Sequence, residues 1–85
     1  MVGGGTVATR RVRALVDAGA SVVVIAPAIA AEITELRLEA HPRPFTQTDL
    51  DGAWLAIACT DDPDVNASVA AAAERRPIFC VRSDA

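Results

Sequence analysis

Three short apolar runs, none of which alternates with polar residues, most constrain how this chain can fold. The first spans residues 22–25, Val-Val-Val-Ile, and the others span residues 54–59 and 78–81. Strands that are apolar on both sides are typical of parallel sheets, because helices cover both faces of such a sheet. The runs therefore predict three buried strands, over residues 21–26, 54–59 and 78–81.

Amphipathic helical segments separate these strands. Between residues 6 and 18, apolar side chains recur at helical spacing, and Gly19 follows where a left-handed residue commonly ends a helix. A second helix is predicted to begin at Pro63, because Asp62 suits an N-cap and proline suits the first helical position. The expected buried stripes are Ala8, Val12, Leu15 and Val16 in the first helix and Val65, Val69, Ala72 and Ala73 in the second.

Shorter elements complete an alternating pattern. A helical stretch is expected over residues 28–35, a strand over 36–40 and a helical turn over 48–52. Strands that alternate with helices predict an α/β fold, with a parallel sheet and helices on both of its faces. We expect one domain, residues 1–85, truncated at both ends, because its first strand would be only two residues long.

Composition and charge exclude several classes of protein. The net charge is −3 and there is no basic block, which argues against a nucleic-acid partner. The apolar runs reach only about six residues, whereas a membrane span needs about 20. Cys59 and Cys80 both lie in apolar runs, which favours buried thiols in a reducing cytoplasm. The only histidine, His41, lacks partners at a ligand spacing, so no metal site is expected.

Three consecutive glycines follow the first strand. Residues 3–8, Gly-Gly-Gly-Thr-Val-Ala, match the pattern G-x-G-x-x-G/A of dinucleotide-binding domains. In that pattern Gly3 allows the tight turn, Gly5 lets the backbone approach a pyrophosphate, and Ala8 keeps the helix close to the sheet. Gly4 lies within the same turn. The context of a strand before the motif and an amphipathic helix after it supports a Rossmann-like, NAD(P)-binding fold.

The cofactor is expected to lie at the start of the first helix. The free amides near Thr6 and Val7 would point at the phosphate charge. An acidic residue for the adenosine ribose is expected about 20 residues on, but Ala26, Pro27 and Ala28 occupy that place. No arginine follows immediately to receive a 2′-phosphate, so NAD is slightly favoured over NADP and the choice stays open. The alternative is a glycine-rich turn that binds no ligand.

Polar residues follow two of the later strands. Thr60 and Asp61 come directly after one strand, at the edge of the sheet where ligands bind in open parallel sheets. They either lie near the cofactor or merely help Asp62 to cap the next helix. Asp84 follows the last strand, where a carboxylate could exchange a proton beside the nicotinamide or could simply be a solvated terminal residue.

Segments along nearly the whole chain carry a family resemblance: residues 2–8, 10–13, 17–20, 24–27, 43–45, 49–50, 54–62, 65–66 and 76–80. Together they resemble one known family, the precorrin-2 dehydrogenase / sirohydrochlorin ferrochelatase domain at the N-terminus of siroheme synthase. The stretch from Trp54 to Asn66 is more specific for this family than the glycine motif.

The resemblance implies NAD-dependent oxidation of precorrin-2 to sirohydrochlorin, followed in many members by insertion of ferrous iron at the same site. It implies NAD contacts at Thr6, Val7, Pro27 and Ala28. It also implies a catalytic role for Asp84, as the acceptor of a proton from the tetrapyrrole. The family's dimerising and helical regions, which complete the tetrapyrrole cleft, are absent from these 85 residues, and a homodimer is expected of the full-length protein.

Two other interpretations stay open. The chain could be a non-catalytic NAD(P)-binding module that regulates a partner protein, or an inactive fragment of the enzyme. The regulatory module would retain the glycine turn, whereas only the enzyme requires Asp84 and an open cleft for a tetrapyrrole.

Overall fold

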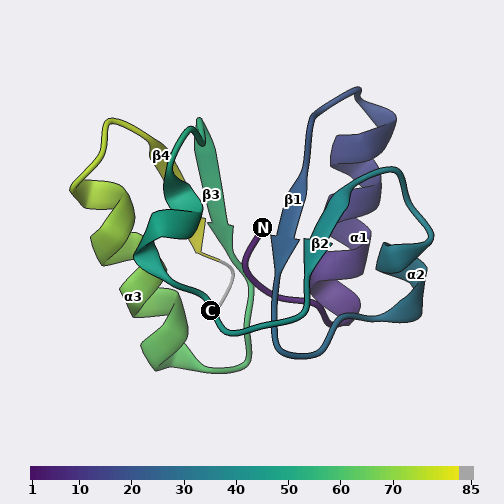
Figure 1. Cartoon of the computed structure of the whole chain (residues 1–85), viewed down its shortest axis with the longest axis horizontal. Coiled ribbons are helices and arrows are strands. Elements are labelled where there is room, and N and C mark those ends of the chain that lie inside the picture. Colours follow the sequence, from purple (N-terminus) through teal and green to yellow (C-terminus); the bar gives the residue numbers. More distant parts are fainter. Residues whose placement is uncertain (83–85) are drawn as a thin grey trace.

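The computed structural model describes residues 1–82, and the predicted elements are all present in it (Figure 1). Their bounds differ from the expected ones by at most three residues, most at α2 and β2. The elements are α1 (Thr6–Asp17), β1 (Val23–Ile25), α2 (Ala31–Thr34), β2 (Glu39–His41), the 3-10 turn η1 (Gln47–Leu50), β3 (Leu55–Ala58), α3 (Pro63–Glu74) and β4 (Phe79–Arg82).

Val2 joins two strand pairs into one parallel sheet. β1 pairs with β2, and β3 pairs with β4, both in parallel. Between these pairs, Val2 forms parallel bridges to Ile25 and to Ala58. Its N–H donates to the Ile57 carbonyl at 2.8 Å, and its own carbonyl accepts from the Cys59 N–H at 2.8 Å. The spatial order is thus β2, β1, the N-terminal residues, β3 and β4, which confirms the predicted α/β fold.

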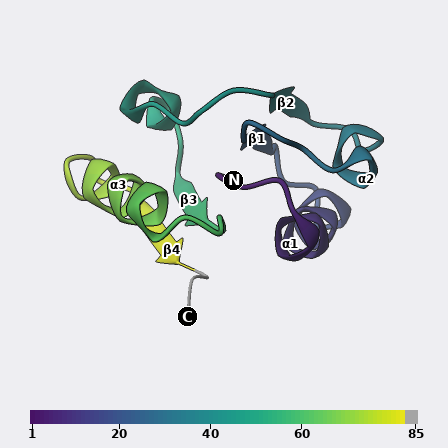
Figure 2. The ribbon, with the colours of Figure 1, turned by 90° about the horizontal axis from the view of Figure 1, so that it is seen from below.

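Helices cover both faces of this sheet, as expected. Paired residues of a parallel bridge share a face, so Val2 and Ala58 point one way while Val24 points the other. On the first face, Val2 and Ala58 pack with α3 and η1 through a core that includes Val69. On the other face, Val24 packs with α1 and α2 through a core that includes Val12. Figure 2 shows these two pairs of helical elements on opposite sides of the strands.

Local sequence rules determine both long helices. Gly19 follows the end of α1 with φ of +86°, the left-handed conformation expected there. At the start of α3, the Asp62 carboxylate accepts a hydrogen bond from the Asp64 N–H at 2.9 Å, and Pro63 occupies the first helical position. Among the described residues, no helix is long and apolar enough to cross a bilayer.

The expectation that all three apolar runs are buried strands is wrong for the third run, in which no residue is buried, and at Trp54 in the second run. Trp54 is 90% exposed, Phe79 is 80% exposed and Val81 is 43% exposed. β4 has a neighbour on one side only within residues 1–82, and Phe79 pairs with Leu55 on the face opposite α3. The cover that α1 and α2 give to the β1 half does not extend over these side chains, so the apolar run alone overestimated their burial.

The two thiols are half-buried rather than buried, which corrects the expectation for both. Cys80 packs against the α3 side of the sheet and Cys59 against the α1 side, so the two thiols cannot approach each other. Burial raises the pKa of each thiol above its ordinary value.

A salt bridge between Arg43 and Asp49 orders the segment between β2 and β3. Asp49 lies in η1 and accepts hydrogen bonds from the Arg43 guanidinium, at 2.9 Å to Nη1, and from the Thr46 N–H, at 2.8 Å. These contacts orient η1, whose Leu50 is buried in the α3-side core. The hydrogen bond from Arg43, with the smaller effect of Thr46, lowers the pKa of Asp49 from 3.8 to about 2.

We expect Val2→Asp to destabilise the fold severely. The change would put an unpaired carboxylate at a position that is 3% exposed, which costs about 3 kcal/mol or more in the free energy of unfolding. Val7→Asp is the control, because Val7 is 52% exposed and a carboxylate in the first turn of α1 is favourable. Urea denaturation followed by circular dichroism measures both variants, and equal midpoints would contradict the structural role of Val2.

Asp49 should also make the free energy of unfolding depend on pH in the acid range. Because folding lowers its pKa, the carboxylate stabilises the fold above pH 3.8, and this stabilisation is lost as pH falls from about 4 towards 2. Asp49→Asn should therefore show a flatter decline in unfolding midpoint than the parent over that interval. Asp17→Asn, at an exposed carboxyl on α1, should retain the parent's decline. A decline in Asp49→Asn as steep as the parent's would assign the acid dependence to other groups.

Candidate functional site

Gly3 and Gly4 are glycines because the protein's own backbone lies against them. The N-terminal residues leave the sheet between β1 and β3 at the carboxyl ends of the strands, with the Gly3 N–H donating to the Ile25 carbonyl at 3.0 Å. Gly3 has φ of +133°, and an added Cβ there would lie 2.3 Å from the Cys59 carbonyl oxygen. On Gly4 it would lie 2.4 Å from the Ala28 carbonyl oxygen. Close packing of the backbone therefore requires a glycine at both positions.

Gly5 differs from its two neighbours. Its φ of −89° is accessible to any residue, and no atom lies within 4 Å of where a Cβ would be. The fold itself therefore sets no requirement for glycine at this position. An exposed glycine with open space in front of it fits the close approach of a ligand's phosphates to the backbone.

The start of α1 offers uncapped donors to that space. Gly5 is the N-cap and supplies no side-chain acceptor, and the first bond of the helix runs from the Thr9 N–H to the Gly5 carbonyl at 2.9 Å. The N–H groups of Thr6, Val7 and Ala8 therefore have no acceptor within the helix. The first turn contains no acidic side chain, so its positive end is not compensated. These residues fit the diphosphate of a dinucleotide.

The loop after β1 lies beside the glycine turn. Pro27 and Ala28, both exposed, follow the strand directly, and the Ala28 carbonyl lies against Gly4. The Ala30 N–H donates to the Gly4 carbonyl at 2.9 Å and ties this loop to the turn. The structure thus brings together two segments that were predicted as contacts on different grounds.

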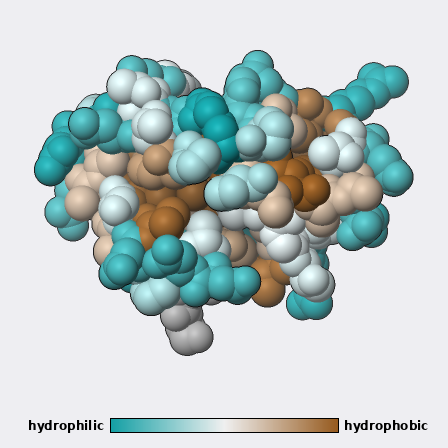
Figure 3. Space-filling view, turned by 60° about the horizontal axis from the view of Figure 1, so that its bottom comes forward, coloured by the Kyte–Doolittle hydropathy of each residue, from teal (hydrophilic) through white to brown (hydrophobic). Residues whose placement is uncertain are grey.

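A pocket of about 330 Å³ lies at the same edge of the sheet. Pro27, Thr60 and Asp61 all contribute to its wall, so three of the predicted site residues share it. Figure 3, with this edge turned forward, shows apolar patches among hydrophilic atoms. A mostly apolar wall with a few polar groups is typical of small-molecule sites. The other lining residues are Val2, Ile25, Ala26, Pro44, Phe45, Asp62, Val65 and Ser68.

Thr60 is held by Asn66, a residue that the sequence analysis did not select for the site. The Thr60 N–H donates to Asn66 Oδ1 at 3.1 Å, and the Asn66 side-chain amide donates to the Thr60 carbonyl at 3.0 Å. The Thr60 hydroxyl lies 2.8 Å from Asn66 Oδ1 and 2.9 Å from the Asp62 carbonyl. Asn66 is wholly buried. An asparagine beside the apolar stripe of α3 is the sequence feature that could have indicated it.

The structure agrees only in part with the alternative prediction that Thr60 and Asp61 help Asp62 to cap the helix. Asp62 caps α3, while the Thr60 hydroxyl accepts from the Asp62 N–H at 3.1 Å and so shapes the turn before the helix. Asp61 is exposed and lines the pocket. Asp84, the predicted catalytic residue, lies outside the described residues.

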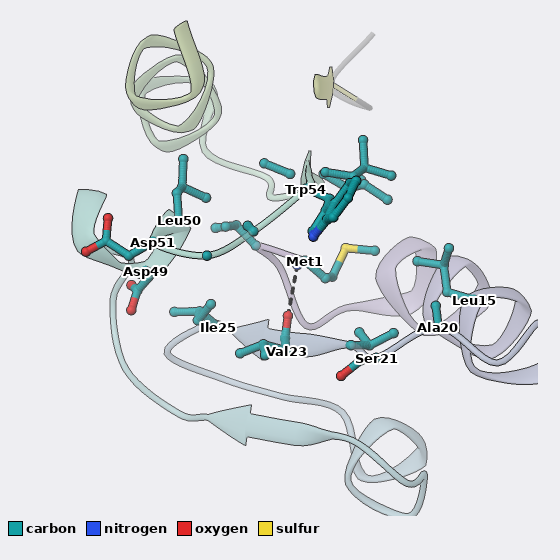
Figure 4. Close-up of a pocket in the computed structure, with 17 residues that line it drawn as sticks. Met1, Leu15, Ala20, Ser21, Val23, Ile25, Asp49, Leu50, Asp51 and Trp54 are labelled. Carbon is teal, nitrogen blue, oxygen red and sulfur yellow. Dashed lines mark hydrogen bonds between the residues drawn. The ribbon is translucent and has the colours of Figure 1, made fainter. Parts of the chain in front are cut away.

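A larger pocket, of about 580 Å³, lies at the opposite edge of the sheet, where β1 and β3 begin (Figure 4). In it the Met1 ammonium donates to the Val23 carbonyl at 2.9 Å, and burial lowers the pKa of that amine. Trp54 and Leu15 lie on its wall. None of the predicted site residues within residues 1–82 lines it, because those follow the carboxyl ends of the strands.

Neither pocket is accompanied by a metal-ligand cluster. Within residues 1–82, no three His, Cys, Asp or Glu side chains are grouped so that they could hold a metal ion. His41 instead lies 2.8 Å from the Glu39 carboxylate, through its Nε2.

We expect Gly5→Asp to raise stability and to abolish dinucleotide binding. An aspartate at the N-cap would accept from the free amides of α1, which adds a few tenths of a kcal/mol over glycine. The same carboxylate would occupy and repel the phosphate position. NADH fluorescence titration and thermal unfolding measure the two effects, and unchanged NADH affinity would refute the placement of the diphosphate.

Two further variants separate the causes of that effect. Gly5→Asn caps the helix without adding a charge, so the difference between it and Gly5→Asp isolates the repulsion. Gly4→Ala should instead lower the unfolding midpoint, because its Cβ would meet the Ala28 carbonyl.

Comparison with known proteins identifies the family of this chain. A model of a family described as NAD(P)-binding matches residues 1–85. The chain is 49% identical over 82 residues to siroheme synthase of Tolumonas auensis, covering 93% of this chain and 17% of that protein. It is 47% identical over 89 residues to siroheme synthase of Salmonella typhi, covering 100% of this chain and 20% of that protein. It thus spans about a fifth of the length of these relatives.

A solved structure has the same fold. SirC, a precorrin-2 dehydrogenase, matches with a TM-score of 0.76 and 36% sequence identity, over 81% of this chain and 37% of that chain. The sequence-based resemblance and the predicted cofactor class, a nicotinamide dinucleotide, are both confirmed by these matches. By sequence and by fold, the chain belongs to the NAD(P)-binding family that its glycine turn predicted.

Proposed function

We propose that this chain forms the NAD-binding part of an enzyme that oxidises precorrin-2 to sirohydrochlorin during siroheme synthesis. The observation that carries the proposal is the open glycine turn at Gly5, in a chain that resembles a precorrin-2 dehydrogenase. The names of its relatives, siroheme synthase and precorrin-2 dehydrogenase, support this reaction and this pathway.

The chain's own residues would bind and orient the reactants. NAD, when bound, supplies the acceptor for a hydride from the tetrapyrrole. The amides of Thr6 and Val7 would hold the diphosphate, with Pro27 and Ala28 alongside it. The pocket beside Thr60 and Asp61 lies in the crevice outside the carboxyl ends of β1 and β3, where ligands of open α/β sheets bind.

The proton that leaves the tetrapyrrole with the hydride needs an acceptor. From the family resemblance, we propose that the Asp84 carboxylate takes it. A positioned general base of this kind contributes typically 10²- to 10⁴-fold to a rate. We extend the proposal to a homodimer as the complete enzyme, and to ferrous iron as a second substrate of the same site.

A second candidate function is NAD(P) binding without catalysis, as part of a regulatory protein. Within the described residues, the only ionisable side chains that line the pocket are Asp61 and Asp62, and Asp62 caps α3. A module that only senses the dinucleotide would need no further base. The two candidates therefore differ in whether Asp84 is required.

We expect Asp84→Ala, in the full natural reading frame that carries this sequence, to slow sirohydrochlorin formation by about 100-fold or more. NADH affinity should stay at the parent value, because Asp84 is not among the proposed diphosphate contacts. The assay follows the absorbance of NADH and of sirohydrochlorin with precorrin-2 and NAD as substrates. Asp17→Ala, at the far end of α1, is the control and should keep the parent rate. Equal rates for Asp84→Ala and the parent would remove Asp84 from the mechanism, and no turnover by the parent would favour the regulatory module.

A further inference from the structure

A fully buried amide lies beneath the carboxyl end of β3. Asn66 is 0% exposed. On α3 it lies next to Val65, which packs against the α3-side core, and three residues before Val69, which belongs to that core. Burying a side-chain amide costs stability unless its polar atoms find partners. Within residues 1–82, the hydrogen-bond partners of the Asn66 side chain all belong to one residue, Thr60.

The bonds between these two residues fix a peptide group rather than a side chain alone. Asn66 Oδ1 accepts from the Thr60 N–H, and Asn66 Nδ2 donates to the Thr60 carbonyl. Both main-chain groups of Thr60 are thus held from within α3. The amide therefore sets the orientation of the peptide that joins Cys59 to Thr60.

That same peptide lies against the glycine turn. A Cβ on Gly3 would be 2.3 Å from the Cys59 carbonyl oxygen, 2.8 Å from its carbon and 3.4 Å from the Thr60 nitrogen. Gly3 is therefore packed onto the peptide that Asn66 holds. Contacts run without interruption from Asn66 through Thr60 to Gly3, which is three residues before Thr6, the first of the open amides of α1.

We propose that Asn66 is a positioning residue for the dinucleotide site. By holding the Cys59–Thr60 peptide, it fixes the surface on which the glycine turn packs and the wall of the pocket formed by Thr60 and Asp61. This inference rests on the proposed binding of NAD(P) at the glycine turn. An apolar residue at position 66 would leave the Thr60 N–H and carbonyl without their bonds to α3.

The central variant is Asn66→Leu, which keeps the branching and the number of non-hydrogen atoms of the side chain and removes all of its bonds to Thr60. We expect its NADH dissociation constant to rise about tenfold or more, as the loss of buried hydrogen bonds implies. Val69→Ala is the matched control, because Val69 is also wholly buried on α3 but makes no hydrogen bond to Thr60. It should lower the unfolding midpoint and leave the NADH affinity of the folded protein unchanged.

A second variant, Asn66→Ala, tests the same contact without the bulk of leucine. It removes the bonds to the Thr60 N–H and carbonyl and should weaken NADH binding, whereas Val69→Ala should not. If Asn66→Leu does not fold, the difference between Asn66→Ala and Val69→Ala decides the question. Equal NADH affinity in these two variants would then overturn the proposal.

A measurement without dinucleotide separates this inference from the proposed function. In a Cys80→Ser background, the half-buried Cys59 is the only thiol, and its rate of reaction with a disulfide reagent reports on the peptide that Asn66 holds. We expect faster reaction in Asn66→Leu than in Val69→Ala. If the parent binds no NADH, the proposed function fails. Separately, equal rates of thiol reaction in Asn66→Leu and Val69→Ala would refute the positioning role of Asn66. If NADH binds and both variants keep the parent affinity, Asn66 contributes to folding alone.

Discussion

The backbone hydrogen bonds of Met1, Val2 and Gly3 hold this fold together. β1 with β2 and β3 with β4 are separate parallel pairs, and among residues 1–82 only Val2 connects them by strand bridges. Because Val2 bonds to β3 and Met1 and Gly3 bond to β1, the glycine turn leaves the sheet between the two pairs. The loops after β1 and β3 therefore lie on either side of that turn, and the site depends on this arrangement.

The three consecutive glycines have different physical causes. Gly3 combines a positive φ with contact to the Cys59 carbonyl, and Gly4 lies against the Ala28 carbonyl. Only Gly5 has neither constraint, so no contact within the described residues requires a glycine there. The proposed diphosphate site depends on this difference, because a turn that served packing alone would not need the third glycine.

The packing beneath the site is more polar than the apolar pattern of α3 suggests. Asn66 puts an amide in the core, and within residues 1–82 the partners of that amide all belong to Thr60, which lies against the glycine turn. The opposite face of the same strand pair shows the reverse departure, since Phe79 and Val81 are apolar yet exposed on β4. In both cases the burial of the side chain depends on tertiary contacts, which the secondary structure by itself does not specify.

The sequence alone determined the order and type of the elements, the caps at Asp62 and Gly19, and the family. These depend on local chemistry: β-branched runs favour strands, an aspartate before proline begins a helix, and a glycine ends one. Only the tertiary structure decided that Pro27, Thr60 and Asp61 share one pocket, that Asn66 holds Thr60, and that Phe79 is exposed. Those facts depend on which strands are neighbours and which faces are covered, and residues far apart in the chain acquire such relations only when the sheet assembles.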